Sequence, residues 1–331
     1  MPQTPPSYDI LGIGNAIVDV VAPTGEDFLS RHNLRKGGMA LISADQAASL
    51  YAAMPPGQES SGGSAANTCA VAAGLGARVA FLGKVADDAL GQAFRRDIAG
   101  VGVHFPTAPL QGGVPTARCL IAVTPDAQRT MSTYLGAAQE LDARDLADVE
   151  IAGAAILYLE GYLWDPEVPR AAMRRAINVS RAAGRKVAFS LSDAFLLSRH
   201  GDDFRALLAA NLIDMLFANE IEAMALAGAA DFDGAVRWLQ DKAPIVVITR
   251  GAQGAVVLAG DAVHHVAAVP VQHVVDTTGA GDLFAAGFLF GLARDETLPR
   301  CAALGAIAAA EVISHYGARP EANLRALAGL A

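Results

Sequence analysis

Short runs of aliphatic and β-branched residues alternate with longer alanine-rich stretches along most of this chain. Such runs are typical of buried strands, whereas the longer stretches repeat their apolar residues with the period of a helix. Because each strand is followed by a helix, the order predicts an α/β fold with one mostly parallel sheet between two layers of helices. The clearest strands are 9–14, 79–83, 155–159, 186–190, 215–218 and 245–249. The clearest helices are 64–75, 166–183, 219–227, 232–241, 282–293 and 298–314, and the first has Ser64 as its expected N-cap and Gly76 as its stop.

Two segments, 20–51 and 103–137, break this alternation with glycine, proline and threonine between short alternating runs. We expect them to form a small β-rich lid that projects from the main sheet. The chain has no low-complexity linker and no internal repeat. Residues 1–331 are therefore predicted to be a single domain with a lid.

Charge and composition exclude several classes of protein. The formal net charge of -9 argues against a broad basic surface for nucleic acid. No uncharged apolar run is long enough to cross a membrane, and the polar start of the chain lacks the pattern of a signal peptide. The three cysteines have no metal-ligand spacing, so reduced thiols are expected. These features predict a cytoplasmic enzyme, as a monomer or homodimer, whose partners are small molecules.

The most informative local motif is Asp-Thr-Thr-Gly-Ala-Gly-Asp at 276–282, which leads directly into an apolar helix. Gly279, Ala280 and Gly281 permit a tight turn whose backbone amides face one point at the start of the helix. The helix dipole adds positive potential there, so the turn is a candidate anion site. Asp282 places a carboxylate beside it that could accept a proton from a hydroxyl. The competing interpretation is an ordinary glycine turn with Asp282 as a helix cap.

A second motif, at 62–68, reads Gly-Gly-Ser-Ala-Ala-Asn-Thr and precedes an alanine-rich helix, a strand and the segment 83–91. Segments 63–91 and 276–289 together resemble the two signatures of the ribokinase-like, or PfkB, family of carbohydrate and nucleoside kinases. The resemblance implies a three-layer ribokinase-like sandwich. It also implies transfer of the γ-phosphoryl group of ATP to an alcohol with Mg²⁺, with Asp282 as the catalytic base.

Further matches to the family concern the nucleotide and the metal. Asn219 and Glu222 resemble its NxxE motif, which holds Mg²⁺ and phosphates through water; a plain helix cap is the alternative. The turn after strand 245–249 resembles the segment that contacts the nucleotide. The resemblance implies nucleotide contacts for Thr249, Gly251, Gly254 and Thr278, a phosphate contact for Arg129, and a candidate K⁺ site at Asp276.

The acceptor site implied by the resemblance begins at Asp19, at the end of the motif Gly-Asn-Ala-Ile-Val-Asp at 14–19. A carboxylate can accept hydrogen bonds from two vicinal hydroxyls, as on ribose. The same site is expected to include Asn15, Gly63 and Asn67. The residues expected to form apolar walls for a base are Met39, Leu41, Leu135, Tyr162 and Leu163.

Segments 14–19, 28–34 and 135–138 are more similar to adenosine kinases than to ribokinases. The resemblance therefore implies the 5′-hydroxyl of adenosine as acceptor and AMP as product. Ala65, Ala66 and Thr278 depart from the eukaryotic adenosine kinase pattern, and Thr278 is common in sugar kinases. A kinase for ribose, fructose or another sugar stays open as the alternative. A ligand-binding protein that has lost catalysis is a third interpretation.

Overall fold

A nine-stranded sheet forms the centre of the computed structural model, which describes residues 5–126 and 128–330. Its strand order is β14-β13-β12-β11-β10-β9-β1-β5-β6. All pairs from β12 to β6 are parallel, whereas β12, β13 and β14 pair antiparallel. The strands are β1 (Tyr8–Ile13), β5 (Val79–Leu82), β6 (Val103–His104), β9 (Ala154–Glu160), β10 (Lys186–Ser190), β11 (Met215–Asn219), β12 (Ile245–Thr249), β13 (Ala255–Ala259) and β14 (Ala262–Val266).

Helices cover both faces of this sheet, because its buried strands alternate apolar side chains between two cores. Ile10 of β1 belongs to one core and the next residue, Leu11, to the other. The first core includes α3 (Ser64–Leu75), α4 (Ala89–Gly100), α10 (Ala280–Leu292), α11 (Leu298–Val312) and α12 (Leu324–Leu327). The second includes α5 (Asp148–Ala152), α6 (Glu167–Ala182), α7 (Ala194–Ala209), α8 (Glu220–Ala227) and α9 (Phe232–Leu239). Short 3₁₀ turns are η1 (Gly136–Glu140), η2 (Ala143–Asp145), η3 (Gly161–Trp164) and η4 (Gly251–Gln253).

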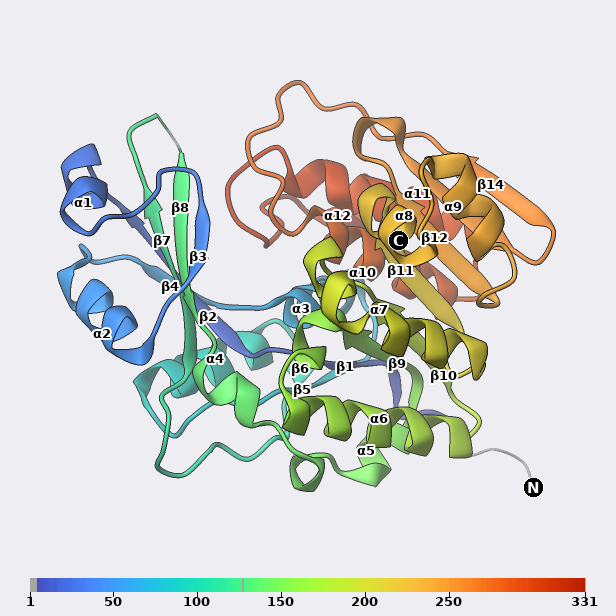
Figure 1. The fold of residues 1–331 in the computed structure, drawn as a ribbon, viewed down its shortest axis with the longest axis horizontal. Helices are drawn as coiled ribbons and strands as arrows, with labels where there is room; N and C mark the ends of the chain where they lie inside the picture. Colours follow the sequence, from blue (N-terminus) through green and yellow to red (C-terminus); the bar gives the residue numbers. More distant parts are fainter. Residues whose placement is uncertain (1–4, 127, 331) are drawn as a thin grey trace.

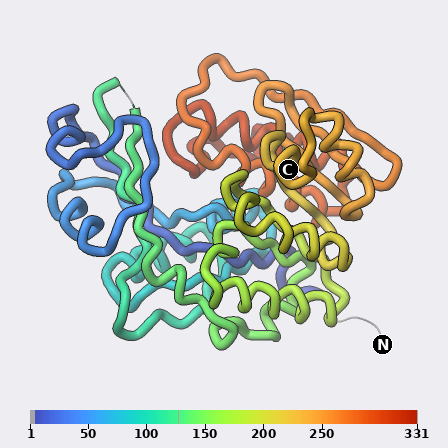
Figure 2. The backbone as a smooth tube through the Cα atoms, viewed as in Figure 1, coloured from blue at the N-terminus to red at the C-terminus, as the bar shows by residue number. Residues whose placement is uncertain are grey.

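A second sheet of five strands stands beside the main body, at the left of Figure 1. Its order is β3-β8-β7-β2-β4, with α1 (Glu26–Arg31) and α2 (Ala44–Ala53) next to it in the view. Its strands are β2 (Ile17–Pro23), β3 (Met39–Leu41), β4 (Gln58–Gly62), β7 (Ala117–Val123) and β8 (Arg129–Tyr134). The chain trace in Figure 2 shows that the blue and green parts of the sequence build it together.

This sheet differs in extent from the segments 20–51 and 103–137. Strand β4 lies outside both segments, and Val103–His104 pairs with β5 in the main sheet. The strand pairing explains both differences. Strand β4 joins the second sheet because it pairs antiparallel with β2, whereas β6 joins the main sheet because it pairs parallel with β5.

The α/β architecture predicted from the alternation of strands and helices is confirmed, and β10, β12 and α3 have the predicted bounds. The antiparallel edge formed by β13 and β14 is absent from that prediction. Gly76 ends α3 in the left-handed conformation as expected, but the N-cap of α3 is Gly63, not Ser64. The Ser64 side chain instead reaches α10 across the cavity described below.

The order of strands reverses next to β1. From β1 the chain continues to β5 and β6 on one side, whereas β9 lies on the other side and leads to β10, β11 and β12. Ligands of such sheets bind outside the carboxyl ends of the strands at the reversal. Among the helices of residues 5–126 and 128–330, none has the length and apolar character to cross a membrane.

Candidate active site

A cavity of about 460 Å³ opens at this edge, between the second sheet and the main body. Its volume lies in the range of small-molecule sites. The second sheet contributes Ile17, Asp19, Cys119, Ile121, Met131 and Thr133 to its lining. The rest of the lining is Gly63, Ser64, Asn67, Tyr162, Ser190, Ser192, Phe217, Ala218, Asn219, Glu222, Thr249, Thr278, Gly279, Gly281, Asp282, Phe284 and Ala318.

The glycine turn before α10 forms one end of the cavity. Gly279 is the N-cap of α10 in the left-handed conformation, with φ of 78°, and a Cβ there would lie 2.7 Å from the Cβ of Ala318. A side chain at this position would therefore be disfavoured both by the backbone conformation and by the contact with Ala318. The amide of Ala280 donates to the carbonyl of Thr277 at 3.2 Å, so Ala280 gives its donor to the turn. The following amides, of Gly281 and Asp282, have no acceptor inside the helix, which makes them the donors for an anion.

Asp282 lies in the first turn of α10, and its carboxylate faces α3 across the cavity. One oxygen accepts from Ser64 Oγ at 2.6 Å and the other from Asn67 Nδ2 at 3.1 Å. Burial raises the pKa of Asp282 to about 6, although these two hydrogen bonds and the cation of Arg319 lower it. A carboxylate with such a pKa is ionised at neutral pH and can still take up a proton.

Asp19 reaches the same cavity from β2 of the second sheet. Burial raises its pKa to about 6, Arg129 and Arg319 oppose this, and the nearby Asp282 adds to it. Asn67 lines the cavity together with the two carboxylates, and its Oδ1 atom is buried without a hydrogen-bond partner among the described residues. A buried acceptor of this kind calls for a donor such as a ligand hydroxyl.

Gly63 completes this part of the site, because the chain must pass very close to Asn15 here. Its φ is 101°, and a Cβ would lie 2.1 Å from the carbonyl oxygen of Asn15. Asn15 itself is buried outside the lining, where its backbone and side-chain amides donate to Glu160 at 2.7 and 2.6 Å. Glu160 also accepts from the amide of Ala65 at 2.7 Å. Asn15 and Glu160 thus join β1, β9 and α3 beneath the cavity.

Asn219 and Glu222 form a capping box at the start of α8. Asn219 accepts from the amide of Glu222 at 2.8 Å, and Glu222 accepts from the amide of Asn219 at 3.0 Å and from its Nδ2 at 2.7 Å. The helix cap is therefore real, yet Glu222 is buried and lines the cavity rather than facing solvent. Burial raises the pKa of Glu222 to about 7, with Asp193 contributing.

Asn219 and Glu222 fit a Mg²⁺ ion that keeps several of its water ligands. Within the part of the chain that the structure describes, no group of three or more His, Cys, Asp or Glu side chains could enclose a metal ion. Mg²⁺ in phosphate-transferring sites is commonly bound by one or two carboxylates and the substrate phosphates. Glu222, a single buried carboxylate at the cavity wall, suits that arrangement.

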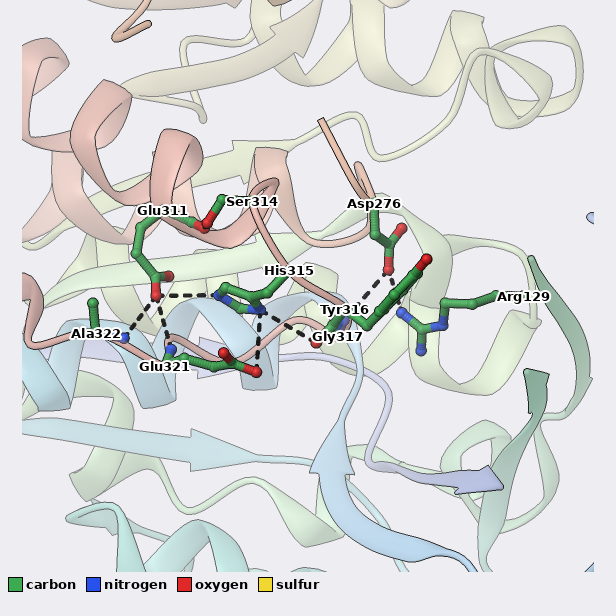
Figure 3. Close-up of polar contacts among 9 residues, drawn as sticks. All are labelled: Arg129, Asp276, Glu311, Ser314, His315, Tyr316, Gly317, Glu321 and Ala322. Atoms are coloured by element: carbon green, nitrogen blue, oxygen red, sulfur yellow. Dashed lines mark hydrogen bonds and ion pairs between the residues drawn. The ribbon is translucent and has the colours of Figure 1, made fainter. Parts of the chain in front are cut away.

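Asp276 lies at the edge of the glycine turn, and Figure 3 shows its contacts with Arg129 and Gly317. One oxygen accepts from the amide and hydroxyl of Thr278 at 2.9 and 2.7 Å. The other forms an ion pair with Arg129 of β8 and accepts from the amide of Gly317 at 3.4 Å. Although burial opposes it, Thr278 and Arg129 hold the pKa of Asp276 below its usual value. Arg129 is thus bound to the turn and does not line the cavity.

The comparisons with known proteins agree with one another. The model of the family described as pfkB family carbohydrate kinase matches residues 41–324. The crystal structure of adenosine kinase from Sinorhizobium meliloti is 46% identical, with a TM-score of 0.89, over 97% of this chain and 98% of that one. A probable sugar kinase from Rhizobium etli CFN 42 is 41% identical, with a TM-score of 0.89, over 98% of this chain and 100% of that one. Adenosine kinase 2 of Arabidopsis thaliana is 27% identical over 94% of this chain and 96% of its own length.

The chain belongs to the pfkB family of carbohydrate kinases. The family and the ribokinase-like fold predicted from the two motifs are confirmed. The chain is a phosphotransferase with an alcohol acceptor, and membership of the family implies the use of ATP and Mg²⁺.

Most of the residues predicted to form apolar walls for a base lie outside the cavity lining. Of the five predicted wall residues, only Tyr162 lines the cavity. Leu163 is fully buried in the second core, because the 3₁₀ turn η3 directs it under the sheet. Met39 and Leu41 are 59% and 65% exposed on β3, an edge strand of the second sheet, and neither lines the cavity. Leu135 is the N-cap of η1, outside the lining.

The inner face of the second sheet provides the apolar wall instead. Ile17 of β2, Cys119 and Ile121 of β7 and Met131 of β8 all line the cavity. Cys119 and Ile121 are two residues apart, and side chains two apart on a strand share a face. These residues belong to the short alternating runs of segment 103–137, but the alternation of a strand does not tell which of its faces turns toward the site.

Thr249 and Thr278, which are predicted to contact the nucleotide, line the cavity, whereas Gly251 and Gly254, at η4, are not part of its lining. Arg319 is the functional candidate that the sequence analysis missed. Its cation acts on both Asp19 and Asp282.

Proposed function

We propose that this chain transfers the γ-phosphoryl group of ATP to the 5′-hydroxyl of adenosine, giving AMP and ADP. The observation that carries the proposal is the single cavity in which Asp19, Asn67 and Asp282 meet beneath an apolar wall. The 46% identity to the adenosine kinase of Sinorhizobium meliloti supports the choice of acceptor.

In the proposed reaction, Asp282 accepts the proton of the acceptor hydroxyl as the oxygen forms its bond to phosphorus. The bond from phosphorus to the ADP oxygen breaks in the same displacement. The amides of Gly281 and Asp282 stabilise the negative charge on the transferred group, helped by the dipole of α10. Mg²⁺ would neutralise charge on the phosphates, and Glu222 is the residue that would help to hold it. Thr249 and Thr278 contact the nucleotide.

The acceptor contacts divide between the sugar and the base. Asp19 and the unpartnered Oδ1 of Asn67 together accept from the ribose 2′- and 3′-hydroxyls. The base lies against Ile17, Ile121 and Met131 of the second sheet, where an apolar ring removes apolar surface from water. A free sugar would fill the polar half of the cavity only, which favours a nucleoside.

The second sheet acts as a lid in this proposal, because it supplies both Asp19 and the apolar wall. Closure would exclude water from the phosphoryl group. Asp276 is a poor fit for K⁺: its oxygens already accept four donors, one of them the cation of Arg129, so the ion would have to displace Arg129. We place the enzyme in the cytoplasm as a monomer or homodimer, in keeping with its three free, buried cysteines.

A sugar kinase is the second candidate, favoured by the 41% identity to the probable sugar kinase of Rhizobium etli and by Thr278 in the turn. A screen that couples ADP release to nucleosides and sugars tests the choice. Adenosine should give the highest kcat/KM. Ribose or fructose at the head of the ranking would replace adenosine as acceptor and leave phosphoryl transfer intact, whereas no ATP-dependent turnover of any alcohol would reject the proposal.

A further inference from the structure

Arg319 lies in the segment between α11 and α12, next to Ala318, which lines the cavity. Its Nη2 donates to the carbonyl oxygen and the hydroxyl of Ser61 at 2.7 and 2.9 Å. Its Nη1 lies 3.5 Å from the carbonyl oxygens of Ala66 and Asn67, in the first turn of α3. Ser61 in turn donates its amide and hydroxyl to Asp97 of α4 at 2.7 and 2.5 Å. The guanidinium therefore joins β4, α3 and α4 behind the candidate base.

The segment that carries Arg319 is fixed on both sides of that residue, as Figure 3 shows. Glu311 of α11 accepts from the amides of Glu321 and Ala322, each at 2.8 Å, and lies 3.1 Å from His315 Nε2. On the other side, the amide of Gly317 donates to Asp276 at 3.4 Å. Because a long side chain keeps its position only if its backbone is held, these contacts account for the placement of Arg319.

The charge of Arg319 acts on both carboxylates of the cavity. Burial lowers the pKa of Arg319, while Asp97, Asp19 and Asp282 raise it. Among residues 5–126 and 128–330, the other groups that act on or contact Asp282 are neutral or acidic and supply no cation: Ser64, Asn67 and Thr68 from α3, Tyr158 and Glu160 from β9, Tyr162 from η3 and Asp19 from β2.

Two carboxylates that share one cavity oppose each other's ionisation, and burial opposes both. Asp19 also has the cation of Arg129 on β8, whereas the cation that acts on Asp282 is that of Arg319. Catalysis as proposed requires both carboxylates to be ionised at once, one to receive a proton and one to hold hydroxyls. A fixed positive charge that acts on both carboxylates favours this state.

We propose that Arg319 is a positioning residue for phosphoryl transfer, which fixes the first turn of α3 and balances the charges of Asp19 and Asp282. The inference rests on the proposed role of Asp282 and is independent of which alcohol is the acceptor.

The test is the pH profile of kcat/KM, measured by ADP release with the best acceptor of the wild-type enzyme. In the wild type the acid limb should lie near pH 6, the pKa of both Asp19 and Asp282. Arg319→Gln should move that limb upward by about one pH unit, a typical effect of removing one nearby charge. Arg319→Lys keeps the charge and should hold the limb within about half a unit, despite weaker hydrogen bonding. Arg294→Gln is the matched control, because Arg294 also donates to a backbone carbonyl at an end of α3, that of Gly76, away from the cavity.

A structural role alone gives a different result. It predicts that Arg319→Gln lowers kcat/KM by the same factor at every pH and leaves the limb in place, which would overturn the proposal. Asp97→Asn supplies a second variant if Arg319→Gln does not fold. It removes the negative charge next to Arg319, so the limb should move to lower pH, and an upward shift would contradict the proposal. Absence of an acid limb in the wild type would instead count against Asp282 as base.

Discussion

Replacement of Asp282 by Asn removes the proposed base and preserves nearly every contact of the side chain. An Asn side chain can still accept from Ser64 Oγ through its oxygen, where the distance is now 2.6 Å. Its new amino group would face Asn67 Nδ2, but a flip of Asn67 would turn its unpartnered Oδ1 toward that group. The loss in folding stability should therefore not exceed about 1 kcal/mol, the value of one hydrogen bond. Loss of a general base costs about 100- to 10,000-fold in rate, or roughly 3 to 5 kcal/mol in the barrier.

The assay is ADP release at saturating ATP and acceptor, with ADP affinity measured by calorimetry on the same variant. We expect turnover to fall by at least about 100-fold, with ADP affinity largely kept. Because Asp282 and Asp19 must both be ionised, wild-type activity should be lost as pH falls through about 6, and only the part of that loss that comes from Asp19 should persist in the variant. Asp231→Asn is the control: Asp231 caps α9 outside the cavity, and its variant should turn over normally. Turnover of Asp282→Asn within about tenfold of wild type would reduce Asp282 to a helix-end residue and refute the reasoning.

Three further results are expected. Asp19→Ala should lower kcat/KM for adenosine by roughly 100-fold, the loss of hydrogen bonds to a charged group, and 2′-deoxyadenosine should show part of that loss with the wild-type enzyme; equal use of both acceptors would remove Asp19 from the diol site. Glu222→Gln should raise the Mg²⁺ concentration for half-maximal rate by about tenfold, and an unchanged titration would exclude Glu222 from the metal's surroundings. Acceptor binding should slow hydrogen exchange in segments 20–51 and 103–137, and unaltered exchange in both would contradict lid closure.

The fold was predictable because strand and helix periods are local properties. Strands such as Ile245–Thr249 are continuous aliphatic runs, and the helix Ser64–Leu75 ends at a glycine with the left-handed conformation its position requires. The hairpin of β13 and β14 was not predicted, because it departs from the alternation of strands and helices and pairs antiparallel. The N-cap at Ser64 was wrong because Asp282, distant in sequence, binds that hydroxyl.

The candidate site also has a part that was predictable from local sequence and a part that depends on tertiary packing. Asp282 and the glycine turn stand in a contiguous motif, so the sequence places them together. The lid wall of Ile121 and Met131 depends on which face of the second sheet turns inward, a matter of tertiary packing. Arg319 stands alone in an irregular segment, and its role arises from carboxylates that come from β2 and α10.

The central claim is tested most directly by competition in one reaction. Adenosine, ribose and fructose are supplied at equal concentration with limiting ATP labelled in its γ-phosphate, and the labelled products are separated and identified. If Asp19 holds a ribose diol while Ile17, Ile121 and Met131 enclose a purine, most of the label should appear in AMP. Label found chiefly in ribose phosphate or fructose phosphate would contradict adenosine as the acceptor.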